Sequence, residues 1–177
     1  PDPISSRPAP VATEDPGVYG GLTVERGNPG QGDVTVTTPW WQVEHSAAQG
    51  GAIRSIRFAN GTGENILVET PASRIISDAE YSDTLDPQPT LTVEQSTPSY
   101  VRLKVTGRML SREGKALCPF EHVYEYRPML VRRTCRYMLP EDGVHCSGVS
   151  VGSMTLAPRL SECAFRRADD RTTWGHA

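Results

Sequence analysis

Alternation of apolar and polar residues with a period of two is the feature that most restricts the fold of this chain. Val101, Leu103 and Val105 alternate with charged or polar residues, which is the pattern of a strand with one buried and one solvated face. The same period recurs in short runs separated by glycine- and proline-containing turns. No window carries an apolar helical stripe with caps. The sequence therefore predicts an all-β protein.

The expected strands are short and follow one another closely. They cover residues 18–25, 33–38, 40–45, 52–58, 65–69, 73–78 and 91–94, and a meander of four neighbouring antiparallel strands follows within 99–156. Gly107 is expected to mark a bulge, and Gly114 to supply the positive φ of a hairpin loop. Many short strands with such turns favour an antiparallel two-sheet β-sandwich, with few or no helices, over a small barrel.

The two ends of the chain differ in composition from its middle. Five prolines fall within residues 1–16, which predicts a linker or extension that is semi-rigid at most. We expect the sandwich domain to span residues 17–160 and residues 161–177 to be a polar tail or a truncated boundary. Because the first residue is proline, we expect processing or excision from a longer protein. For the C-terminal end, a natural disordered tail is an equal alternative to a fragment boundary.

Charge and hydropathy argue against two classes of partner. The chain has 18 basic and 21 acidic residues and a formal net charge of −3, so no strong positive field favours nucleic acid. No run approaches the roughly 20 apolar residues that cross a bilayer. We therefore expect neither a nucleic-acid nor a membrane partner.

The cysteines all lie in the second half of the chain, at Cys118, Cys135, Cys146 and Cys163. None forms a C-x-x-C pair, so a zinc ribbon is disfavoured. The expected hairpin places Cys118 and Cys135 near one level, which favours a disulfide between them and leaves Cys146 with Cys163. An even number of cysteines fits an oxidising compartment, so we expect a secreted or extracytoplasmic protein. Four free buried thiols are the competing interpretation.

Two adjacent tryptophans precede a double glycine. Trp40 and Trp41 lie on one expected strand, and Gly50 and Gly51 open the next. Neighbouring strand residues face opposite sides, so one indole can pack in the core while the other binds substrate by stacking on a sugar ring. Burial of both, against the core or a companion domain, is the favoured alternative because large aromatic residues mostly serve packing.

The order of these features resembles the galactose mutarotase-like supersandwich domains of carbohydrate-active enzymes. The matching segments are the strand at 40–45, the Gly-Gly-x-Ile turn at 50–53, the glycine turn at 60–63, the Asn-Ile-Leu strand at 65–67 and the Tyr-x-Tyr strand at 124–126. Polysaccharide lyases and glycosidases of several families carry such a domain beside a catalytic domain. The resemblance implies a domain of a secreted enzyme that acts on a polysaccharide, contributing to the substrate cleft or supporting a catalytic domain.

The partners that this resemblance implies are a polysaccharide or oligosaccharide and a companion domain of the same parent chain. It transfers no catalytic residue to a position of this chain. A non-catalytic carbohydrate-binding module and a structural or assembly module are therefore alternatives, since fold analogy is weak support for function.

Candidate catalytic residues lie on one face of the expected strand at 117–126. His122 and Tyr124 are the residue types that a polysaccharide lyase requires, because a base removes the proton next to a uronate carboxylate and a phenol protonates the leaving oxygen. Arg133 or Arg136 on the adjacent strand is a candidate to neutralise the uronate. The favoured alternative is an aromatic ladder in the core, since Phe120 shares this face.

Two further sets of residues are weaker candidates. His45 ends its strand and is a candidate general base, with a hydrogen-bonded structural histidine as the favoured alternative. Asp83 and Asp86, or Asp78 and Glu80, offer oxygen ligands for Ca²⁺. No calcium motif is present, so a solvated acidic loop is the favoured interpretation and we expect no cofactor.

Overall fold

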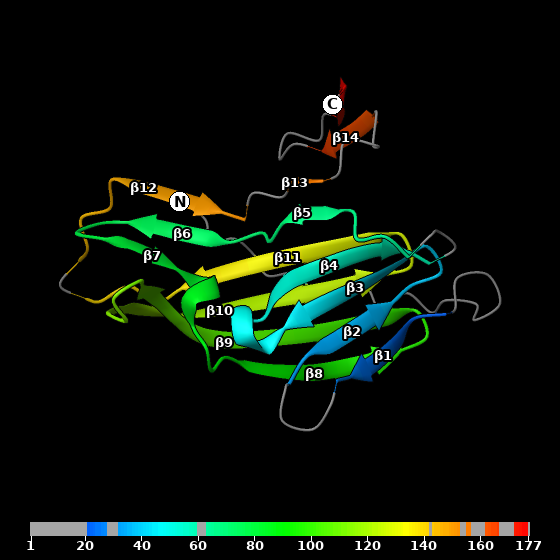
Figure 1. The fold of residues 1–177 in the computed structure, drawn as a ribbon, viewed down its shortest axis with the longest axis horizontal. Helices are drawn as coiled ribbons and strands as arrows, with labels where there is room; N and C mark the ends of the chain where they lie inside the picture. Colours follow the sequence, from blue (N-terminus) through cyan, green and yellow to red (C-terminus); the bar gives the residue numbers. More distant parts are fainter. Residues whose placement is uncertain are drawn as a thin grey trace, which may run out of the picture.

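Strands make up the regular structure of the protein (Figure 1). A computed structural model describes residues 21–27, 32–59, 63–141, 143–152, 155–156, 162–166 and 172–176, and it describes only the backbone of residues 156, 162–166 and 172–176. Among these residues there are strands and two single-turn 3-10 helices, and no α-helix. The expected all-β class is confirmed. The proline-rich extension at 1–16 lies outside the described residues.

The smaller sheet is formed by the first strands of the described chain. It contains β1 (Thr23–Arg26), β2 (Val34–Thr37), β3 (Trp41–Ser46) and β4 (Ala52–Phe58), antiparallel and in that order. The 3-10 helix η1 (Ala47–Gln49) and the glycine pair Gly50–Gly51 join β3 to β4. Both glycines have positive φ, 63° and 70°, the conformation that the double glycine supplies at low cost.

The larger sheet curls into a nearly closed, barrel-like form. Its strand order in the described residues is β11 (Leu130–Tyr137), β10 (Ala116–Arg127), β9 (Tyr100–Ser111), β7 (Glu80–Ser82), β6 (Ser73–Ile76) and β12 (Gly148–Val151), and β8 (Thr90–Thr97) also pairs with β9. The helix η2 (Asp83–Leu85) follows β7. Two short ladders join β5 (Leu67–Glu69) to β13 (Thr155–Leu156) and β14 (Glu162–Arg166) to β15 (Thr172–His176).

The core lies between the two sheets. Val36 and Val43 of the smaller sheet are buried in one cluster with Leu103, Val105 and Tyr124 of the larger sheet. On β9 the alternation seen in the sequence becomes an inner row of buried residues and an outer row that is half-exposed. Burial of the inner rows, at about 25 cal/mol per Å² of apolar surface, holds the layers together.

The expected meander is only partly present. Strands β9, β10 and β11 are neighbours in antiparallel order, as predicted. The fourth expected strand does not join them: β12 pairs with β6 at the other end of the sheet, and β13 pairs with β5. Ser147 N donates to Ile76 O at 2.9 Å just before the new pairing begins. Pairing at the far end brings the sheet close to closure and protects an edge.

Gly107 does not mark a bulge. It pairs in register with Phe120, and the register shift lies between Ala116 and Cys118. A Cβ on Gly107 would lie 2.7 Å from Phe120 Cζ and 2.8 Å from Asp86 Oδ2. Glycine is therefore required here by close packing. Gly114 does have the expected positive φ, 81°.

The expected disulfide between Cys118 and Cys135 is wrong. Cys118, Cys135 and Cys146 are free thiols, because the β10–β11 register places His122, not Cys118, opposite Cys135. Burial and the nearby Cys146 raise the pKa of Cys118. Cys163 lies outside the residues whose side chains are described, so its expected pairing with Cys146 has no counterpart among the described residues.

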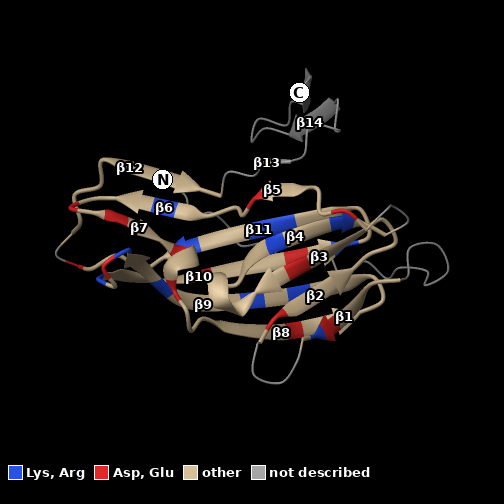
Figure 2. Ribbon diagram, in the orientation of Figure 1, with Lys and Arg blue, Asp and Glu red and all other residues tan. Residues whose placement is uncertain are grey.

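Charged residues of both signs are spread over the strands (Figure 2). On the outer face of the larger sheet, Lys104 and Arg136 pair with Glu121 at 2.6 and 3.6 Å, and Arg102 pairs with Glu94 at 2.7 Å. These half-exposed pairs contribute little stability each. No helix in the described part of the chain is long and apolar enough to span a membrane.

Candidate functional site

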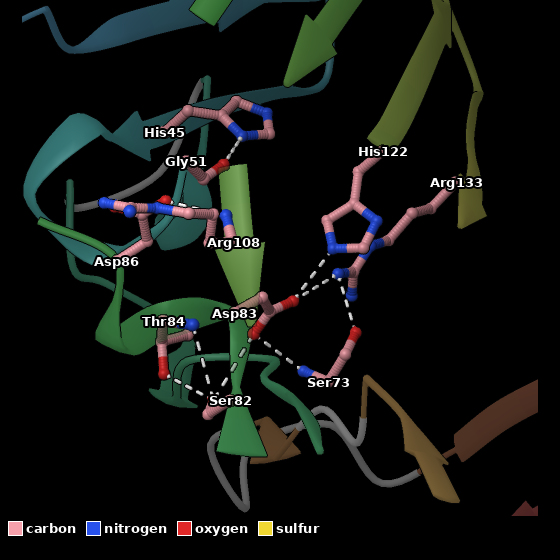
Figure 3. Close-up of polar contacts among 10 residues, drawn as sticks. All are labelled: His45, Gly51, Ser73, Ser82, Asp83, Thr84, Asp86, Arg108, His122 and Arg133. Carbon is pink, nitrogen blue, oxygen red and sulfur yellow. Dashed lines mark hydrogen bonds and ion pairs between the residues drawn. The ribbon is translucent and has the colours of Figure 1, made fainter. Parts of the chain in front are cut away.

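Three charged side chains from distant parts of the chain meet in the interior (Figure 3). His122 Nε2 donates a hydrogen bond to Asp83 Oδ2 at 3.0 Å, and Arg133 Nη2 donates to the same oxygen at 2.9 Å. Ser73 contributes its backbone N, 2.9 Å from Asp83 Oδ1, and its Oγ, 3.0 Å from Arg133 Nη2. Asp83 and His122 are each only 1% exposed. We call these residues, Ser73, Asp83, His122 and Arg133, the buried ionic cluster.

Short local structures hold Asp83 in position. It is the first residue of η2, and Ser82 caps this turn by accepting a hydrogen bond from the amide two residues further on. Gly50 N donates to Asp86 O at 3.1 Å, which ties the β3–β4 connection to η2. A Cβ on Gly50 would lie 1.9 Å from Asp83 O, so the double glycine lets the two connections approach closely.

The cluster favours ionised groups. Burial raises the pKa of Asp83, but the hydrogen bond from His122 and the charge of Arg133 outweigh it, and the net pKa lies below its ordinary value. Burial lowers the pKa of His122, while the hydrogen bond to Asp83 and the proximity of Cys135 raise it, and the net pKa is raised. A carboxylate and a protonated imidazole are therefore mutually stabilised.

Cys135 lies beside this cluster. On the inner face of the larger sheet, His122 is directly opposite Cys135 and Tyr124 is directly opposite Arg133. Arg133 Cζ lies 5.5 Å from the centre of the Tyr124 ring. Burial raises the pKa of the Cys135 thiol, but the proximity of His122 and the charge of Arg133 outweigh it, so the net pKa is lowered. His122 with Cys135 and Tyr124 with Arg133 therefore form two adjacent cross-strand pairs.

A groove of about 560 Å³ opens at these residues. Most of its lining is aliphatic and comes from β3, β4, β11, β12 and the residues on either side of β5. The aromatic and polar lining consists of Trp41, Phe58, Tyr124, Arg133 and Cys135, and Gly152 lies at the end of β12. We call it the inter-sheet groove. Trp41 Nε1 and Tyr124 Oη are buried and have no hydrogen-bond partner among the described residues. A mostly apolar concavity with a few unpaired polar groups is typical of a ligand site.

His45 serves the core and does not reach the groove. It is fully buried, its Nδ1 donates to Gly51 O at 2.9 Å, and its Nε2 accepts a hydrogen bond from Tyr126 Oη. Burial lowers the pKa of His45 to about 4. The ring is thus a neutral bridge between the β3–β4 connection and β10.

The structure brings some of the predicted site residues together and separates others. Trp41, Tyr124 and Arg133 line the inter-sheet groove, and His122 lies directly behind it. Trp40 lies in the turn before β3 and is 54% exposed, away from the groove lining. Arg136 faces the outer side of the sheet and pairs with Glu121. The two candidate arginines are three residues apart, so they point to opposite faces.

Sequence reasoning missed three members of the site. Asp83 was assigned to a solvated loop, Cys135 to a disulfide, and Ser73 to an ordinary strand. Counting outward from the Arg127–Leu130 turn would have placed Cys135 opposite His122. No local signal joins Asp83 to His122, because only the curl of the larger sheet brings them together.

The acidic residues that are candidates to bind Ca²⁺ make hydrogen bonds to other residues of the protein. Asp86 accepts from the backbone N of Gln88 at 3.0 Å and of Arg108 at 2.7 Å, and Asp78 accepts from Tyr81 Oη at 2.8 Å. The part of the chain that the structure describes contains no cluster of three residues able to hold a metal ion.

Comparison with family models, curated proteins and solved structures finds no match to this chain.

Proposed function

We propose that this chain is a supersandwich-type β-sandwich domain of a secreted carbohydrate-active enzyme, a polysaccharide lyase or a glycosidase, and that its inter-sheet groove holds part of the polysaccharide. Two antiparallel sheets that face each other across one core support the sandwich architecture. The secreted location rests on the sequence resemblance, because the described cysteines are free thiols and give it no support.

One observation carries the proposal: an indole and a phenol with unpartnered polar atoms line a groove between the sheets. Aromatic rings pack against the apolar C–H faces of sugars, while Trp41 Nε1–H and Tyr124 Oη–H are free to donate to ring or hydroxyl oxygens. Arg133 supplies the only positively charged group of the described groove lining, where it favours an acidic sugar.

The burial of both candidate histidines favours a binding role over proton abstraction by this chain. His122 is enclosed with Asp83, and His45 makes hydrogen bonds through both ring nitrogens. Neither histidine lines the inter-sheet groove, whereas Tyr124 and Arg133 do. The second candidate function is therefore a non-catalytic carbohydrate-binding module, in which a companion domain or another protein acts on the polysaccharide.

The two tryptophans provide a matched test of the groove. Binding to a panel of acidic and neutral polysaccharides is measured by calorimetry for the native chain, Trp41→Ala and Trp40→Ala. We expect Trp41→Ala to weaken binding at least about tenfold and exposed Trp40→Ala to change it less than about twofold. Equal losses in both variants, or no binding to any member of the panel, would contradict the proposal.

The appearance of unsaturated product separates the two candidate functions. Incubation of the parent protein with acidic polysaccharides yields an ultraviolet-absorbing unsaturated uronate if the enzyme is a lyase. New reducing ends without that absorbance indicate a glycosidase. Binding without either product supports the non-catalytic module.

A further inference from the structure

We propose that Cys135 is an activated nucleophile that accepts an acyl group from an ester whose apolar part lies in the inter-sheet groove. This inference goes beyond saccharide binding and does not depend on it. It rests on the arrangement of Asp83, His122 and Cys135, on an unpartnered hydroxyl at Tyr124, and on the apolar lining of the groove.

The geometry is that of a thiol, a base and an orienting carboxylate. Asp83 holds His122 through Nε2, so Nδ1 is the ring nitrogen left to interact with Cys135. Among the described residues, Nδ1 makes no hydrogen bond, so it is free to take the thiol proton, and Cys135 is the directly opposed residue on β11. A thiol beside an imidazole that a third group orients is the arrangement of nucleophilic cysteine sites.

Cys135 is also the one described cysteine that lines this groove. It is half-buried there, whereas Cys118 is buried in the core beside Cys146. The raised pKa of His122 and the lowered pKa of Cys135 agree with a thiolate facing an imidazolium. Charge on Arg133 next to the thiol works in the same direction.

The acyl-transfer step can be written with groups that the structure provides. The Cys135 thiolate attacks the ester carbonyl carbon and a C–S bond forms, while the negative charge moves to the carbonyl oxygen. Tyr124 Oη, buried at 1% exposure and unpartnered, is the donor available to that oxygen. When the carbonyl re-forms, the C–O bond to the alcohol breaks, and the leaving oxygen takes a proton from water, while His122 stays protonated behind the thioester.

Hydrolysis of the thioester completes the cycle. Water attacks the thioester carbonyl and loses a proton to the solvent, and the C–S bond breaks. The products are a carboxylic acid and the Cys135 thiolate, which again faces protonated His122. The aliphatic lining from β3 and β4 would hold the acyl chain, so longer acyl groups should react faster than acetyl.

The test uses p-nitrophenyl acetate, butyrate and octanoate with the full chain, followed by intact and peptide mass spectrometry. We expect one acyl group, located on Cys135, and faster reaction with the longer esters. Cys135→Ala should abolish the adduct, and the matched variant Cys118→Ala should leave it unchanged. Labelling of Cys118 or Cys146 at an equal rate, or no labelling of Cys135, would overturn the proposal.

Two measurements keep the test decisive even where a variant of His122 or Asp83 fails to fold. Alkylation of Cys135 in the native chain by iodoacetamide should follow a pH midpoint below that of an ordinary thiol, which is about 8.5. Tyr124→Phe should slow acylation by about tenfold or more because an oxyanion donor is lost. It should leave alkylation, which forms no oxyanion, unchanged. An ordinary midpoint, or equal effects on both reactions, rejects the assignment.

Discussion

At the scale of single residues, close packing against backbone atoms and aromatic rings restricts which side chain a position can hold. Gly107 faces Phe120 and Asp86, and His45 is enclosed between Gly51 and Tyr126. Both positions carry residue types that the sequence marks as unusual within strands. Each position leads to a prediction about stability, and a residue of the same type elsewhere in the chain serves as its control.

Replacement of Gly107 by alanine should lower the free energy of unfolding by about 1–3 kcal/mol through overpacking against Phe120. Gly148 is the matched control, since its Cβ would lie no closer than 3.4 Å to Ile76. Gly148→Ala should change stability by less than about 0.5 kcal/mol. Chemical denaturation of both variants measures the difference, and similar values for the two would show that packing at Gly107 is not tight.

His45 should make the protein less stable in acid. Its folded pKa of about 4 lies below the ordinary 6.5, so the unfolded chain binds the proton more tightly. Its contribution is complete above pH 6.5 and is lost as the pH falls through 4, by up to about 3 kcal/mol. Denaturation at several pH values should show a shallower fall for His45→Gln than for the native chain.

Exposed His145 provides the control for this pH dependence. His145→Gln should keep the native slope between pH 6.5 and 4, because this side chain lies at the surface and not in the core. If His45→Gln retains the full native slope, the acid sensitivity belongs to other groups, Asp83 first among them.

At the scale of elements, the site depends on two connections rather than on the strands themselves. The β3–β4 connection, with Gly50, contacts η2, and η2 presents Asp83 to His122 and Arg133. The β10–β11 hairpin supplies His122, Arg133 and Cys135 through a register fixed by the short turn after Arg127. A change in either connection should therefore alter the buried ionic cluster without touching it directly.

Gly50→Ala should destabilise the protein by more than about 3 kcal/mol and disturb the cluster, because the new methyl group would overlap Asp83 O. Gly63 offers a matched control: its φ is also positive, 75°, but no atom lies within 4 Å of its Cβ position. Gly63→Ala should cost only about 1 kcal/mol of backbone strain. Thermal unfolding and the pH midpoint of Cys135 alkylation report the two effects; equal losses would point to strain alone.

At the scale of the whole molecule, the strands differ in how many neighbours secure them. β9 is hydrogen-bonded on both sides, to β10 along one edge and to β8 and β7 along the other. By contrast, β1 lies at one edge of the smaller sheet, and β12 is the last strand in the order of the larger sheet. Edge strands with few buried side chains open locally at low free-energy cost. The most stable part of the protein should therefore be the centre of the meander.

Amide hydrogen exchange should follow this order. We expect amides of β9 and β10 to exchange at least about a hundredfold more slowly than those of β1 and β12. Mass spectrometry of peptides from these four strands measures the rates under native conditions. Uniform protection would indicate that the nearly closed larger sheet and the smaller sheet unfold as one unit.

The all-β class, most strand positions and the β9–β10–β11 neighbours could be predicted from the sequence. Period-two alternation is a local pattern, and burial of one face follows from it directly. The position of the turn at Arg127–Leu130 also predicts that His122 pairs with Cys135, although the residue types alone suggest other roles for both. Trp41, Tyr124 and Arg133 were singled out because their residue types suit a site.

Only the tertiary structure decided which of these residues meet. Asp83 reaches His122 across 39 positions of sequence, and β12 pairs with β6 rather than with β11. Both contacts follow from the curl of the larger sheet. The curl is stabilised by surface that many segments bury together, so no single segment of the sequence predicts it. The β10–β11 register keeps Cys135 away from Cys118, and the packing of the two sheets places Cys135 at a groove. Local sequence fixes which face of a strand is buried, but the closing of a sheet decides what that face is buried against.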